Sequence, residues 1–82
     1  MRDLTFHVLA SDDGMFLLEA NVWGDFLEVY DCYSISSTET IPDDLKGKKL
    51  YAEVIDFACF VLGLDHDDVY LTDEDETKIL YA

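Results

Sequence analysis

Alternation of apolar and polar residues in the first part of the chain constrains the fold more than any other feature. In residues 4–10 apolar side chains recur at every second position, which is the period of a strand with one buried face. Residues 15–22 repeat this pattern, and residues 25–35 are rich in aromatic and β-branched side chains, which favour strands. The predicted inner face of the second strand consists of Phe16, Leu18, Ala20 and Val22.

Short breaks separate these three segments. Residues 11–14 end in Gly14, which suits a hairpin loop with a left-handed residue. Trp23 and Gly24 lie between two apolar runs, so we expect a tight turn there with an exposed tryptophan. Strands joined by short turns usually pair with their sequence neighbours, and the three segments therefore predict an antiparallel meander.

The middle of the chain predicts one helix. Residues 36–40 form a polar break, and residues 40–43 (Thr-Ile-Pro-Asp) match a helix start, with a cap residue, a proline and an acid. The main helix is expected at residues 48–62, where apolar residues recur at helical spacing. Gly63 then suits a left-handed C-cap.

The last part of the chain predicts a hairpin. Residues 69–71 and 78–81 are apolar runs on either side of an acidic loop at 72–77. The predicted order is β-β-β-α-β-β within a single domain covering residues 1–82. We therefore expect a two-layer α+β fold, with an antiparallel sheet of about five strands and one helix packed on one face.

Charge excludes several classes of function. The 82 residues include 19 Asp or Glu against 5 Lys or Arg, a formal net charge of −14. An apolar content of 50% excludes a disordered acidic tail, and the acidity disfavours direct binding to nucleic acid or to an anionic membrane. No apolar run is long enough to cross a bilayer, and the N-terminal residues lack a signal pattern. We expect a cytoplasmic protein (in the host cytoplasm if a phage encodes it) with Cys32 and Cys59 reduced.

The residues do not predict an enzyme, a metal site or a cofactor. Asp65 could begin a calcium-binding loop, but the glycine that shapes such a loop would be Tyr70. His7 and His66 lie in different predicted elements, so no paired spacing for zinc exists. Cys59 lies among apolar residues and is expected to be a small buried side chain.

The excess of acid suggests a partner of opposite charge. Because carboxylates on strands and loop tips can match the charge density of a phosphate backbone, we expect a non-enzymatic inhibitor that occupies the nucleic-acid-binding site of a basic protein or enzyme complex. In size and acidity the chain is similar to phage-encoded DNA mimics and to bacterial toxin-immunity proteins. The first likeness implies an anti-restriction or anti-CRISPR role in a phage or mobile element. The residues predicted to contact the partner are Asp12, Asp13, Trp23, Glu28, Asp31, Asp65, Asp67, Asp68, Asp73, Glu74, Asp75 and Glu76.

Two other interpretations stay open. In an immunity or antitoxin protein that neutralises a basic toxin, affinity would depend on aromatic anchors such as Trp23, whereas Tyr30, Tyr33 and Tyr70 are expected in the core. Alternatively, the acids only adapt the surface to high salt. The predicted helix is apolar on most sides, so a homodimer is a further alternative.

Overall fold

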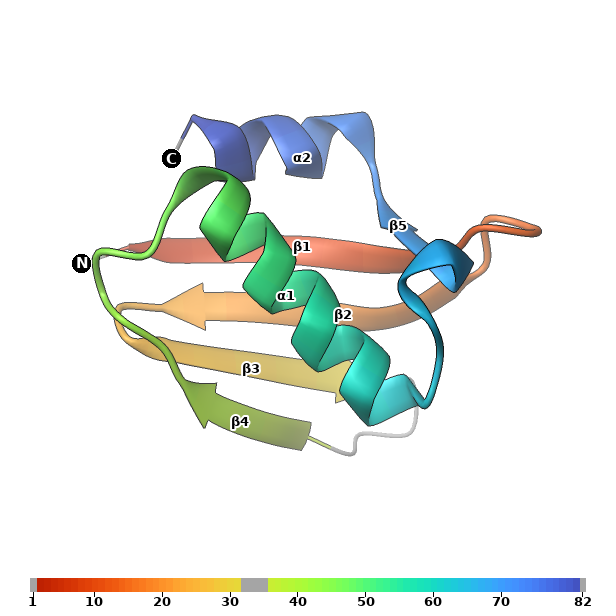
Figure 1. The fold of residues 1–82 in the computed structure, drawn as a ribbon, viewed down its shortest axis with the longest axis horizontal. Helices are drawn as coiled ribbons and strands as arrows, with labels where there is room; N and C mark the ends of the chain where they lie inside the picture. Colours follow the sequence, from red (N-terminus) through yellow and green to blue (C-terminus); the bar gives the residue numbers. More distant parts are fainter. Residues whose placement is uncertain (1, 32–35, 82) are drawn as a thin grey trace.

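The structure is a computed structural model that describes residues 2–31 and 36–81, without the side chains of Asp31 and Ser36. In this described part of the chain, five strands and two helices form an α+β fold (Figure 1). A short 3₁₀ turn, η1, precedes the last strand. The elements are β1 (Asp3–Ala10), β2 (Phe16–Trp23), β3 (Phe26–Asp31), β4 (Ser36–Thr40), α1 (Gly47–Leu62), η1 (His66–Asp68), β5 (Val69–Leu71) and α2 (Asp73–Leu80).

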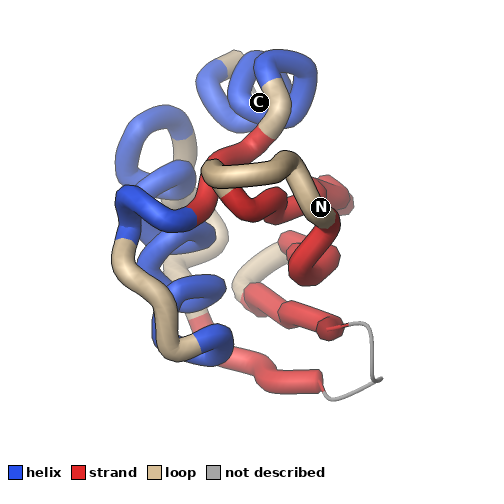
Figure 2. The backbone as a smooth tube through the Cα atoms, turned by 90° about the vertical axis from the view of Figure 1, so that its right-hand side faces the viewer, coloured by secondary structure: helices blue, strands red, loops and turns tan. Residues whose placement is uncertain are grey.

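All strands pair antiparallel in the order β4-β3-β2-β1-β5. The predicted meander of the first three strands is confirmed. Helix α1 connects the two edges by crossing one face of the sheet diagonally, and α2 runs beside β1 (Figure 1). Figure 2, which turns the molecule by 90°, shows α1 on one side of the strands and, among the described residues, no element on the other. One sheet face is therefore left open.

The core lies between the sheet and α1. Helix α1 buries residues at helical spacing, including Leu50, Val54 and Ala58, which confirms the predicted helix. Gly63 ends α1 in the predicted left-handed conformation, with φ of 71°. The sheet side of the core consists of Phe6, Val8, Leu18, Ala20, Val22, Leu27 and Val29.

A β-bulge turns one predicted core residue outward. The β1–β2 register pairs Val8 with Leu18 but Leu9 with Phe16, so Leu17 is the extra residue. Phe16 thereby leaves the phase of Leu18 and shares the open face with Leu9. Its side chain is 44% exposed, and the prediction that it lies in the core is wrong.

Two predictions about the middle of the chain are also wrong. Residues 36–40 form β4 instead of a polar break. This edge strand has no apolar residue, so the alternation of apolar and polar residues that predicts a strand is absent. The helix-start pattern at 40–43 does not begin α1. Ile41 is buried, and its N–H donates to the carbonyl of Asp25 at 2.7 Å, so the chain is still tied to the sheet there.

The predicted terminal hairpin is a strand followed by a helix. Residues 69–71 form β5 as expected, but residues 73–80 form α2. Thr72 caps this helix by accepting a hydrogen bond from the N–H of Asp75 at 3.2 Å, and acids fill the first turn, where the helix dipole favours them. No helix among the described residues has the length and apolar character needed to cross a membrane.

Candidate functional site

Two exposed loops meet at one end of the long axis of the molecule (Figure 1). The tip of the β1–β2 hairpin contributes Asp12 and Asp13. The segment around η1 contributes Asp65, Asp67 and Asp68. All five side chains are exposed. These five aspartates, named the acidic end below, combine two groups that are far apart in sequence.

Hydrogen bonds fix the two loops against each other. The N–H of Ser11 donates to the carbonyl of Asp68 at 2.9 Å, and its hydroxyl donates to the carbonyl of Asp67 at 2.8 Å. Asp13 accepts a bond at 2.9 Å from the backbone N–H two residues further along. The Asp68 carboxylate accepts a hydrogen bond from the N–H of Asp65 at 3.1 Å, as part of a capping box at the start of η1. The backbone that presents these carboxylates is therefore held in place.

The opposite end of the molecule has mixed charge. It contains four of the five basic residues, close to the start of β1 and the start of α1. This mixed-charge end comprises Arg2, Lys46, Lys48 and Lys49 together with Asp3, Asp25, Asp43 and Asp44. The net charge is thus polarised along the molecule, because the ionisable side chains of the two loops at the acidic end are five aspartates and His66, with no Lys or Arg.

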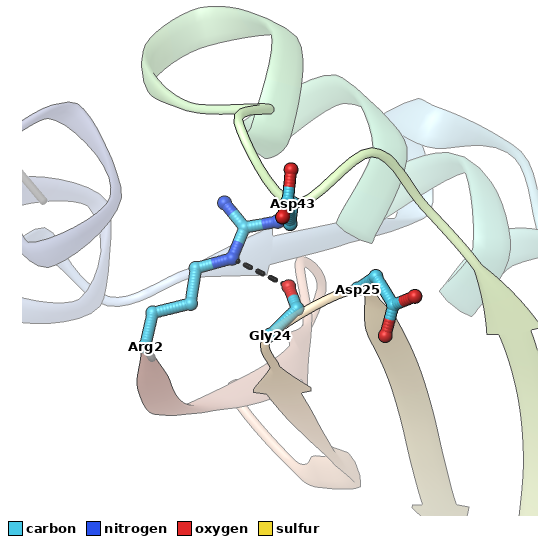
Figure 3. Close-up of a pocket in the computed structure, with 4 residues that line it drawn as sticks. All are labelled: Arg2, Gly24, Asp25 and Asp43. Carbon is cyan, nitrogen blue, oxygen red and sulfur yellow. Dashed lines mark hydrogen bonds between the residues drawn. The ribbon is translucent and has the colours of Figure 1, made fainter.

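A hollow of about 580 Å³ lies at the mixed-charge end. Its Arg2 side chain donates to the carbonyl of Gly24 at 2.9 Å (Figure 3). It also donates to the carbonyls of Pro42, at 2.8 Å, and Leu45. The guanidinium therefore joins the β2–β3 turn to the loop before α1, and we assign it a structural role. The hollow is lined by Arg2, Gly24, Asp25 and Asp43.

The predicted acidic loop at 72–77 has a different arrangement in the structure. Asp73 and Glu74 are exposed and Glu76 is half-buried, all in the first turn of α2. Asp75 is only 3% exposed, and its carboxylate accepts a hydrogen bond from the N–H of His7 at 2.8 Å. This bond occupies the backbone N–H of β1 next to the last residue that pairs with β5. Asp75 was predicted at the partner surface, but burial gives it an internal role.

The open sheet face, defined by the side chains that alternate away from α1, is rich in aromatic residues. Trp23 and Phe26 are cross-strand neighbours and are 54% and 47% exposed. Trp23 is exposed as predicted, although it ends β2 instead of forming a turn. Tyr70 is also exposed, contrary to the expectation of a core position. Phe16 packs beside His7, with ring centroids 5.9 Å apart.

Polar residues occupy the centre of this face. Glu28 lies opposite Asn21 in the register, and Asn21 donates to Glu19 at 3.4 Å. Tyr30, half-buried, donates its hydroxyl to Glu28, and this hydrogen bond raises the pKa of the phenol. His7 lies 3.7 Å from a Glu19 carboxylate oxygen. Two half-buried carboxylates, Glu19 and Glu28, are therefore framed by exposed aromatic side chains.

Some predicted residues cannot be placed. Asp31 ends β3, but its side chain lies outside the described part of the chain, as do Cys32 and Tyr33 entirely.

The structure also adds a group that the sequence did not indicate. Glu39 of β4 and Glu53 of α1 face each other beside a shallow groove of about 290 Å³, with Asp56 next to them. Burial, the hydrogen bond with Glu53 and the nearby charges raise the pKa of Glu39 to about 7. The groove also includes Phe60, which is 82% exposed. No local sequence signal predicts this group, because only the pairing of β4 with β3 places Glu39 beside α1.

Two features of the described residues bear on nucleophilic chemistry and on metal binding. Cys59 is buried, and burial raises the pKa of its thiol, which opposes formation of the nucleophilic thiolate. Among residues 2–31 and 36–81, no three His, Cys, Asp or Glu side chains are placed to hold a metal ion. Every buried side-chain nitrogen or oxygen in this part of the chain has a hydrogen-bond partner.

Comparisons of the chain with protein-family models, curated proteins and solved structures give no match. The acidic end and the open sheet face are therefore the features from which a function can be inferred.

Proposed function

We propose that the protein is a non-enzymatic inhibitor that occupies the positively charged nucleic-acid-binding site of a target protein. The observation that carries the proposal is the acidic end, where five exposed aspartates from two distant segments lie together. Four of the five basic residues belong to the mixed-charge end, near the starts of β1 and α1. The polarity of net charge comes from the placement of the basic residues, because the mixed-charge end also has four exposed acids, whereas the acidic end has no Lys or Arg to compensate its aspartates.

Charge polarity gives the molecule a preferred approach to a basic groove. A concentrated negative potential accelerates encounter with a cationic surface and orients the molecule during approach. The hydrogen bonds from Ser11 to the η1 segment hold the carboxylate-bearing loops in place, which lowers the entropy lost on binding. Restriction and CRISPR nucleases have cationic grooves of this kind, consistent with an anti-restriction or anti-CRISPR role in the cytoplasm of a phage-infected cell.

The test compares two variants of equal net charge. One has Asp12, Asp13, Asp67 and Asp68 changed to Asn, and the matched control has Asp3, Asp25, Asp43 and Asp44 changed to Asn. Asn keeps the side-chain oxygen that accepts hydrogen bonds, so both variants should fold. Each is used as bait in a lysate of the encoding organism or its host, with mass spectrometry of the bound proteins.

We expect wild type and control to retain the same basic nucleic-acid-binding protein and the acidic-end variant to lose it. Equal retention by both variants would contradict the proposal.

A second candidate is an immunity or antitoxin protein that binds a basic toxin. The observation that favours it is Trp23, which is 54% exposed beside Phe26 on the open sheet face. In such complexes a few aromatic anchors supply most of the affinity. Trp23→Ala should then weaken binding far more than the four changes of the acidic-end variant together, whereas charge mimicry predicts the opposite order.

A further inference from the structure

The open sheet face has a composition suited to one kind of partner side chain. The register places acids and aromatic residues on it, and none of its described side chains is Lys or Arg. Trp23 and Phe26 lie directly opposite each other at one end. Glu28 is two residues beyond Phe26 on the same face of β3, about 6.6–6.8 Å along the strand.

We propose that this face binds an arginine-bearing segment of the target protein. The proposal deepens the proposed function and rests on it for the basic character of the partner. A guanidinium stacks on an aromatic ring and pairs with a carboxylate through its planar fork. An arginine side chain on Trp23 or Phe26 can reach Glu28, so one partner residue would use both features.

The negative charge of the open sheet face disfavours two other partners, a second copy of the chain and a single-stranded nucleic acid. A second copy would bring Glu19 and Glu28 towards the same acids of its partner, and each chain has a formal net charge of −14. Single-stranded nucleic acid also stacks on aromatic side chains, but it needs a positive groove for its backbone. A cationic protein segment satisfies both the aromatic and the acidic side chains.

Arginine and lysine should be distinguished at this face. The exposed aspartates of the acidic end attract lysine and arginine through their charge, and a contribution of the neighbouring Tyr70 there does not depend on Trp23. Stacking on Trp23 and the bidentate pair with Glu28 favour arginine. A preference for arginine that depends on Trp23 therefore identifies this face.

The experiment titrates isotope-labelled protein with a short peptide of alternating arginine and glycine, followed by NMR. The same peptide with lysine in place of arginine is the comparison. We expect the arginine peptide to bind more tightly and to shift the indole signal of Trp23 and the amides of Phe26 and Glu28. Trp23→Ala should weaken arginine binding roughly two- to fivefold and remove the preference over lysine. Tyr81→Ala, which removes an exposed aromatic side chain at the end of α2, is the matched control and should have no effect.

Three outcomes would overturn the inference. The first is equal affinity for both peptides, with shifts confined to the acidic end; the proposed function would survive this result, because its own test uses the acidic-end variant. The second is a shift of the same Trp23 and Phe26 signals by a short single-stranded oligonucleotide. The third is dimerisation that Trp23→Ala abolishes.

Discussion

Asp75 is an acidic residue that stabilises the fold and does not contribute to the acidic surface. Its buried carboxylate accepts from the N–H of His7, lies 3.4 Å from the Lys78 ammonium and 3.6 Å from the ring of His7. These contacts attach α2 to the edge of β1, where β5 has already ended.

We expect Asp75→Ala to lower the free energy of unfolding by about 2–3 kcal/mol, because the His7 N–H loses its acceptor. Asp75→Asn keeps an acceptor and should cost less. Urea denaturation measures both, with the exposed Glu74→Ala in the same helical turn as control, expected at about 0.5 kcal/mol or less. Equal losses for Asp75→Ala and Glu74→Ala would show that the buried bond contributes nothing.

The Glu39–Glu53 pair makes stability depend on pH. Glu39 has a pKa of about 7 in the folded protein against 4.5 in a model peptide, so the folded state binds this proton more tightly. Its contribution is fully present below about pH 4.5 and is lost as the pH rises to about 7.

Glu39→Gln should therefore gain stability relative to wild type between these two pH values. Because the carboxyls are partly solvated, we expect a relative gain of about 1 kcal/mol, measured by urea denaturation at pH 4.5 and pH 8. Asp12→Asn removes the same charge from the exposed hairpin tip and should show no such step. If the stability difference between Glu39→Gln and wild type is the same at both pH values, the pKa of Glu39 is not raised in the folded protein.

At the scale of the elements, α2 depends on its cap. Thr72→Ala removes the side-chain oxygen that accepts from the N–H of Asp75 and should cost about 1 kcal/mol of stability. Thr72→Ser keeps the hydroxyl and should stay within a few tenths of wild type. Urea denaturation distinguishes the two, and an unchanged Thr72→Ala protein would argue against a capped helix.

The sequence predicted the elements whose signals are strong and local. Strands β1 and β2, helix α1 and the Gly63 cap follow from periodicity and from one left-handed position. The fold class and the antiparallel sheet are also confirmed. The element order is not, because β4 and α2 were missed.

The missed elements have physical reasons. Strand β4 has only Ser, Thr and Glu, so an edge strand of this kind shows no apolar alternation. In α2, the apolar run 78–81 resembles a strand, but Thr72 followed by acids already matched a helix start. The bulge at Leu17 could not be predicted, because it is visible only in the pairing of two strands.

At the scale of the whole molecule, tertiary contacts create the candidate site. The acidity at residues 65–68 and the exposure of Trp23 could be predicted from the sequence. That Asp12 and Asp13 join Asp65, Asp67 and Asp68 could not, since only the bonds between the hairpin and η1 bring them together.

The most direct measurement of the mimicry proposal is competition for the captured target. The target is bound to a fluorescent short duplex DNA, and increasing amounts of wild type, acidic-end variant or matched control are added at several salt concentrations. We expect wild type and control to displace the DNA, less effectively as salt increases, and the acidic-end variant to displace it at least tenfold less well (about 1.4 kcal/mol). A ternary complex in which target, DNA and protein remain together would contradict occupation of the nucleic-acid site.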